Sequence, residues 1–120
     1  MNPVSHDLQH LDEHAMKRIV SQPGVVALSV FYEGFPVRSY GNADFEHIAA
    51  LAEDLTREGK KIVDEMKIGS LDQLILETPE NKLIIAPFGD MFLCVYTTSD
   101  APLGLIRILL KGIQTHVANN

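Results

Sequence analysis

Residues 71–98 read LDQLILETPENKLIIAPFGDMFLCVYTT, and this stretch decides the fold. Two short segments in it, residues 79–81 and 89–90, consist of the residue types that tight β-turns use. The apolar runs between and around them predict three strands of an antiparallel meander, over residues 71–78, 83–88 and 91–98. The last two strands lack the polar and apolar alternation of a strand with one wet face. Helices must therefore cover both faces of the sheet.

A helix and a hairpin precede this meander. Residues 5–20 place apolar side chains along one side of an amphipathic helix, which a Pro-Gly pair ends. Residues 25–32 form a β-prone run, and after a Glu-Gly corner a second short strand continues through Tyr40. We predict a tight turn in which Gly34 supplies the backbone freedom, and Pro36 begins an outer strand at a sheet edge.

A long helix over residues 44–68 connects the hairpin to the meander. Asn42 or Asp44 is the expected N-cap and Gly69 the expected terminator. Gly59 is a weak point within the helix, since glycine costs about 1 kcal/mol relative to alanine there. The apolar positions that recur at helical spacing are Phe45, Ile48, Ala52, Leu55, Ile62 and Met66.

A last helix is predicted over residues 101–117, with Asp100 as its cap and a proline in its first turn. Its expected core stripe consists of Ile106, Leu109, Leu110, Ile113 and Val117. Leu105, Ile108 and Gly112 lie off that stripe and form an apolar second face, which either the first helix or an external partner covers.

The predicted order of elements is α-β-β-α-β-β-β-α, in one domain over residues 1–120. With both sheet faces to be covered by only three helices, some helices must lie on each side. The expected class is α+β, with a three-layer α/β/α arrangement around five antiparallel strands.

Composition argues against several classes of function. The formal net charge is −6 and the ten Lys and Arg residues are scattered, which argues against a nucleic-acid partner. No apolar segment approaches the roughly 20 residues that cross a bilayer, and the first residues lack the features of a signal peptide. Cys94 lies in an apolar run, where burial would keep the thiol inert. We therefore expect a soluble, cytoplasmic protein without membrane insertion.

Motifs of known chemistry are missing from the sequence. It contains no GxxxxGK[ST] loop, GxGxxG, HExxH or GxSxG elbow, so we expect neither an enzyme nor a bound cofactor. His6, His10 and His14 have a spacing that could bring imidazoles to one metal ion. They lie opposite the apolar side of the first helix and lack further ligands, so we expect a solvated helix face and no metal site.

Several segments together resemble the Roadblock/dynein light chain family: GVVALSVFYEGFPVRSYG, FEHIAALAEDL, LILETPENKLIIAPFGDMFLCVY and APLGLIRILLKGI. The resemblance covers residues 8–117. Its specific parts are the Gly-hydrophobic-Pro after the first strand, the Gly-Asp turn before the last strand and the Leu-Gly that opens the last helix. It implies a profilin-like fold, with the long helix on one sheet face and the two terminal helices on the other.

The resemblance also implies a function. Members of the family dimerise through the long helix and the third strand, and they scaffold or regulate Ras-like GTPases or serve as dynein light chains. In some bacterial members the dimer accelerates hydrolysis by a Ras-like polarity GTPase by remodelling its switch regions.

The strand over residues 71–78 supports a dimer independently. It would be an edge strand, with Leu74 and Leu76 on one face and Leu71 and Ile75 on the other. So apolar an edge, without Lys or Pro, invites aggregation unless it is paired. Pairing with its twin across a two-fold axis removes the hazard, and a covering loop is the alternative. The expected dimer interface comprises Leu51, Leu55, Leu71, Gln73, Leu74, Ile75, Leu76 and Glu77.

Candidate partner-binding residues lie on the outer side of the long helix and at the hairpin tip. They are Glu46, Glu53, Arg57, Lys60, Lys61, Asp64 and Phe35. A charged outer face is what any solvent-exposed amphipathic helix has. The resemblance implies, as the alternative, that part of this face binds a GTPase. Phe35 either stays exposed as a partner contact or folds back onto the sheet.

Three functions follow from these observations. The first is a dimeric scaffold that binds a small Ras-like GTPase and modulates its nucleotide cycle. The second is a light-chain-like subunit of a dynein-type or lysosomal-scaffold-type complex, paired with a different Roadblock chain. The third is a small-molecule sensor with a ligand between sheet and helix, against which the scarcity of inward-facing polar strand residues counts.

Overall fold

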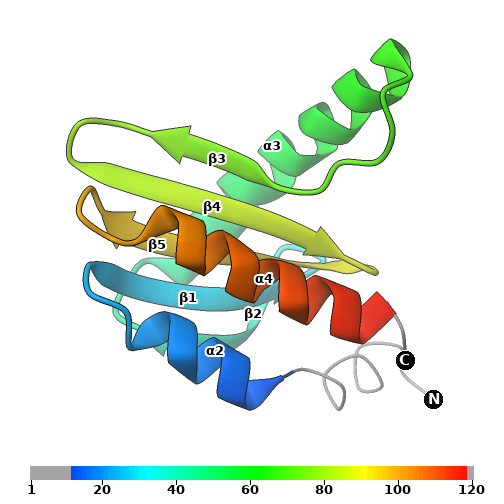
Figure 1. The fold of residues 1–120 in the computed structure, drawn as a ribbon. Coiled ribbons are helices and arrows are strands. Elements are labelled where there is room, and N and C mark those ends of the chain that lie inside the picture. Colours follow the sequence, from blue (N-terminus) through cyan, green and yellow to red (C-terminus); the bar gives the residue numbers. More distant parts are fainter. Residues whose placement is uncertain (1–11, 119–120) are drawn as a thin grey trace.

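The computed structural model describes residues 12–118, which form three helices and one five-stranded antiparallel sheet (Figure 1). In chain order the elements are α2 (Glu13–Val20), β1 (Val25–Tyr32), β2 (Phe35–Gly41), α3 (Phe45–Met66), β3 (Leu74–Glu77), β4 (Asn81–Phe88), β5 (Met91–Thr98) and α4 (Leu103–Ala118). The spatial order of the strands is β2-β1-β5-β4-β3, so the two hairpin-connected groups meet where β1 pairs with β5.

The helices divide between the two faces of the sheet as predicted. Figure 1 shows α3 behind the sheet, and α2 and α4 together in front of it. One buried cluster joins Met16 and Ile19 of α2 to Ile106 of α4 and to strand residues such as Leu28. The other cluster lies under α3; its buried members are Phe31, Ala49, Ala52, Ile85, Phe92 and Cys94. The expected α+β three-layer arrangement is confirmed.

The corner between β1 and β2 is a tight turn with two left-handed residues. Glu33 has φ 48° and Gly34 has φ 82°, while Tyr32 pairs with Phe35 across the turn. Two consecutive positive φ angles match the twist of the flanking strands, which is why glycine is favoured here. β2 is an edge strand, so the missing N–H of Pro36 is tolerated, and the predicted hairpin is confirmed.

Several predicted boundaries were wrong, and local caps explain two of them. α2 begins at Glu13 because Asp12 is its N-cap and accepts a hydrogen bond from the Ala15 N–H at 2.9 Å. Residues 5–11 of the predicted helix lie outside the described residues. Asp44 caps α3 as expected, but the left-handed residue that ends this helix is Lys67, with φ 56°, rather than Gly69.

Asp100 does not cap α4, contrary to the prediction. α4 begins at Leu103, and the Ile106 N–H donates to the Pro102 carbonyl at 3.0 Å. The Asp100 carboxylate instead accepts a hydrogen bond from the Thr98 hydroxyl, which lowers the pKa of that carboxyl.

Cys94 is buried, as expected, and burial raises the pKa of its thiol well above its ordinary value. Within residues 12–118, no helix combines the length and apolarity that crossing a membrane requires.

We expect Gly34→Ala to lower the free energy of unfolding by about 1 kcal/mol, because a Cβ is disfavoured at its φ of 82°. Urea denaturation followed by circular dichroism at fixed protein concentration measures this change. Gly112→Ala is the matched control, since open space faces that helical glycine and alanine is the better helix former. Equal stabilisation by both substitutions would contradict the assigned turn.

Candidate protein-interaction surfaces

The outer edge of β3 is one candidate surface. β3 is the last strand of the sheet, and β4 is the strand it pairs with among the described residues. Ile75 packs on the cluster of α2 and α4, and Leu74 packs on the cluster under α3. Leu76 is 48% exposed although it belongs to a strand. An apolar edge of this kind is open to pairing with another strand.

A stripe of exposed apolar side chains on α3 forms a second surface. Ile62 is 54% and Met66 is 63% exposed, and Leu51 is exposed as well. Sequence periodicity places Ile62 and Met66 among the recurring apolar positions of the helix, and in the structure both are exposed. α3 has 22 residues and is therefore about 33 Å long. Five strands span only about 19 Å. The end of α3, beyond Gly59, consequently projects past the sheet (Figure 1).

A glycine joins these two surfaces. Gly59 is buried, and a Cβ at this position would lie 3.1 Å from Leu74 Cδ1 and 3.2 Å from Leu71 Cδ2. The absence of a side chain lets α3 approach β3 and its preceding connector closely. Gly59 is therefore a packing residue rather than merely the weak point that helix propensity indicates. The β3 edge and the α3 stripe lie side by side as a result.

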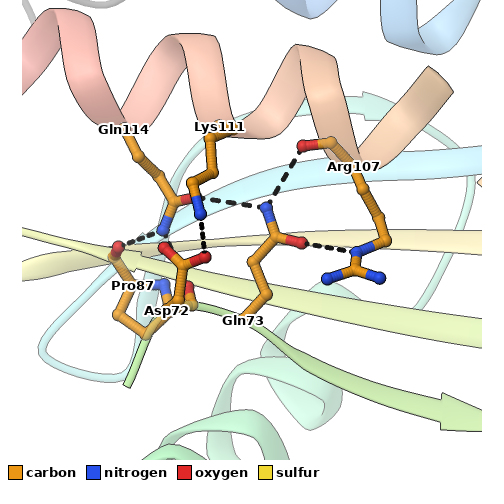
Figure 2. A network of polar contacts seen from close by, with 6 residues as sticks. All are labelled: Asp72, Gln73, Pro87, Arg107, Lys111 and Gln114. Atoms are coloured by element: carbon orange, nitrogen blue, oxygen red, sulfur yellow. Dashed lines mark hydrogen bonds and ion pairs between the residues drawn. The ribbon is translucent and has the colours of Figure 1, made fainter. Parts of the chain in front are cut away.

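Residues 71–73 are not part of the strand, contrary to the prediction. Figure 2 shows why: Asp72 pairs with Lys111 of α4, and Gln73 accepts from Arg107 Nε at 3.2 Å. Gln114 of α4 donates to the backbone carbonyl of Asp72 at 2.9 Å and to that of Pro87 at 2.7 Å. These bonds hold the connector against α4 and away from the ladder.

Two predicted interface residues are therefore turned inward. The side chain of Leu71 lies against Gly59 on the α3 side of the sheet, not on the face of Ile75 as predicted. Gln73 is engaged with α4. The remaining predicted residues, Leu74 to Glu77 with Leu51 and Leu55, stay on or beside the β3 edge and α3. Leu55 is half-buried against the cluster under α3.

The charged residues of α3 do not form one group. Glu53, Arg57 and Lys60 line a hollow beside the hairpin tip, whereas Lys61 and Asp64 face the connector after α3. Glu46 is exposed in the first turn of the helix. Arg57 forms an ion pair with Asp54 one turn earlier.

Phe35 stays exposed beside the hairpin turn, which resolves the open question about its position.

The second face of α4 is not covered by α2. Ile108 is 70% exposed and Leu105 is also exposed, while α2 contacts the opposite side of α4 through the buried cluster. Ile108, Gly104 and Gly112 line a shallow hollow of about 740 Å³ next to the connector. Of the two alternatives for this face, cover by the first helix is thus excluded for the described part of that helix.

The structure offers no metal site among its described residues. No group of three His, Cys, Asp or Glu side chains there could hold a metal ion. His14 is exposed on α2, and His6 and His10 lie outside the described residues.

Comparison with known proteins identifies similar chains. The family model described as the Roadblock/LC7 domain matches residues 11–97. Two uncharacterized proteins of Methanocaldococcus jannaschii are each 31% identical over 71 residues, which is 59% of this chain and 62% of theirs. The match thus spans less than two thirds of the length of these relatives.

Solved structures share the fold. A Roadblock/LC7 domain from Streptomyces avermitilis superposes with a TM-score of 0.77 at 17% identity, over 87% of this chain and 91% of that one. MglB of Myxococcus xanthus gives 0.76 at 15% identity, over 98% and 96%. The gliding protein MglB of Thermus thermophilus gives 0.77 at 11% identity, over 99% and 90%.

We expect Gly59→Leu to lower the free energy of unfolding by about 2 kcal/mol, because the added side chain must displace Leu71 and Leu74. Hydrogen exchange of the β3 amides should accelerate more than that of β1. Gly104→Leu, at a helical glycine with open space before it, is the matched control. If both variants are equally stable, the close contact of α3 with β3 does not require glycine at position 59.

Proposed function

Because this chain belongs to the Roadblock/LC7 domain family, we propose that it is a homodimeric scaffold that binds a small Ras-like GTPase and modulates its nucleotide cycle. One observation carries the proposal: the apolar outer edge of β3, which has no second partner strand among the described residues, lies beside the exposed apolar stripe of α3. The chain itself would supply no catalytic group, and it would act in the cytoplasm through protein contacts alone.

A second copy of the chain fits this combined surface. Antiparallel pairing of two β3 strands across a two-fold axis would satisfy the edge hydrogen-bonding groups of both copies. The same axis would bring the two α3 helices together, so that Ile62 and Met66 cover each other. A single two-fold axis would thus bury both the β3 edge and the α3 stripe. A loop that covered the β3 edge would leave the α3 stripe exposed.

The dimer would present a composite charged face. Glu53, Arg57 and Lys60 from each copy lie on α3, next to the hairpin tip that carries Phe35. Charged residues around an exposed aromatic side chain are the composition of a transient protein interface. We assign this face to the GTPase, in line with what the family resemblance implies.

A heteromeric complex is the alternative, because a different Roadblock chain could pair with the same β3 edge. One structural neighbour is described as MglB with a tetrameric arrangement, and another is MglC of Myxococcus xanthus. A homodimer that is stable without a partner would disfavour this alternative.

The alternative of a small-molecule sensor requires a ligand cavity between sheet and helix, and the space under the middle of α3 is too small for one. The cavity between Phe45, Ile48 and Cys94 measures only about 10 Å³, which is at the lower limit for one water molecule.

We expect light scattering to show that the native chain is a dimer. Leu76→Lys and Ile62→Lys should each raise the dissociation constant of this dimer more than about tenfold, because each variant buries a charge at the interface. Ile108→Lys is the matched control, since Ile108 is an exposed apolar residue too, more exposed than either, but lies on α4. A monomeric native chain, or dissociation by the control alone, would contradict the proposed pairing.

We expect the dimer to bind a Ras-like GTPase from the same genome more tightly in one nucleotide state than in the other. Biolayer interferometry with GDP and with a non-hydrolysable GTP analogue measures this difference. Arg57→Glu and Lys60→Glu should weaken binding about tenfold or more, because close charge pairs at interfaces contribute this much. Lys17→Glu, on α2 across the sheet, should not. If all variants bind equally tightly, the GTPase does not dock on the assigned face of α3. If no Ras-like GTPase binds, the proposal of a GTPase partner is wrong.

A further inference from the structure

A pocket of about 580 Å³ opens at one end of the sheet, between α3, the β1–β2 turn and the β4–β5 turn. Met91 and Phe92 form its apolar floor, and both are almost fully buried. Thr56, Arg57 and Lys60 of α3 line one side. The volume falls within the range of small-ligand sites.

Thr56 is an unsatisfied polar group in this pocket. The residue is only 5% exposed, and its Oγ1 has no hydrogen-bond partner among the described residues. Buried hydroxyl groups are nearly always hydrogen-bonded, and leaving one unpaired destabilises a fold. The oxygen itself is closed off from solvent, so a rotation of the Thr56 side chain about χ1 must bring the hydroxyl into the pocket before a ligand atom can supply the missing partner.

The pocket also has two walls of opposite charge. Arg57 and Lys60 are cations on α3, whereas Glu33 and Asp90 are carboxylates on the two turns. Among the described residues no ion pair joins these cations to these carboxylates; Arg57 pairs with Asp54 instead. Lys60 thus forms no ion pair among the described residues, whereas Arg57 already shares its charge with Asp54.

The carboxylates of the acidic wall affect the neighbouring Tyr32 phenol. The pKa of the Tyr32 phenol is raised by desolvation and further by the negative charges of Glu33 and Asp90. Glu53, on α3 near Gly34, adds a third carboxylate to this side, next to the hairpin tip.

We propose that this pocket binds a small zwitterion, namely a free amino acid or a dipeptide. Its carboxylate would lie toward Lys60 and Arg57 and, once the Thr56 side chain rotates toward the pocket, accept a hydrogen bond from that hydroxyl. Its ammonium group would lie toward Glu33 and Asp90, and its side chain would rest on Phe92. A simple anion or cation would leave one wall unmatched, whereas a ligand with both charges complements the two walls.

The test uses the full chain alone, so its outcome is independent of any GTPase. Titration with the twenty amino acids and with a set of glycyl dipeptides, followed by amide NMR shifts, should reveal saturable binding by at least one compound. The shifts should centre on Thr56 and on residues 89–92. The two sets of compounds distinguish an amino acid from a dipeptide as the ligand.

Variants and analogues identify the groups that bind. Thr56→Val, which keeps the shape of the side chain, and Lys60→Gln should each weaken binding about tenfold. Lys61→Gln is the matched control, because this neighbouring lysine lines a different hollow. N-acetylation or amidation of the ligand, each of which removes one charge, should also weaken binding by about tenfold or more.

Three results would overturn the inference. The first is the absence of saturable binding by every compound in both sets. The second is equal binding of the blocked analogues, which would show that the two charges are not recognised. The third is a Thr56→Val variant that is more heat-stable but binds as tightly as the native chain, which would show that the hydroxyl is only an unsatisfied core group.

Discussion

The architecture depends on strands that bury side chains on both of their faces. β1, β4 and β5 contribute residues to both buried clusters, with Leu93 on the side of α2 and α4 and Cys94 on the side of α3. A sheet of this kind cannot be covered by helices on one side only. The chain therefore places its longest helix on one face and its two terminal helices on the other. The helices cover the two faces, and among the described residues the outer edges of the end strands, β2 and β3, have no further strand beside them.

The length of α3 is the second constraint on the architecture, because the helix is longer than the sheet is wide. The first half of the helix covers the sheet with small residues, of which Ala49 and Ala52 are buried. The last turns, beyond Gly59, have no strand beneath them, yet they keep apolar residues at the same spacing. Apolar residues that extend beyond their own core are typical of a surface that another chain covers. The helix is thus a core element at one end and an interaction element at the other.

The sequence predicted the order of elements, the distribution of helices over the two faces and the hairpin turn, because apolar periodicity and turn residues are local signals. It did not predict that residues 71–73 leave the ladder, since that depends on bonds from Gln73 and Asp72 to α4, about forty positions away. Nor did it show that Ile62 and Met66 are exposed, because periodicity shows which side of a helix is apolar but not what lies opposite that side. Comparison of the helix length with the sheet width could have revealed the overhang.

The connector between α3 and β3 has a consequence for recognition. Leu71 lies under one helical layer while its neighbours Asp72 and Gln73 are bonded to the other, so three successive residues clamp the start of β3 from both sides. An edge strand fixed in this way has already lost most of its conformational freedom before anything binds to it. Association with another strand then incurs a small entropic penalty, and preorganised edges of this kind gain affinity without any added contact.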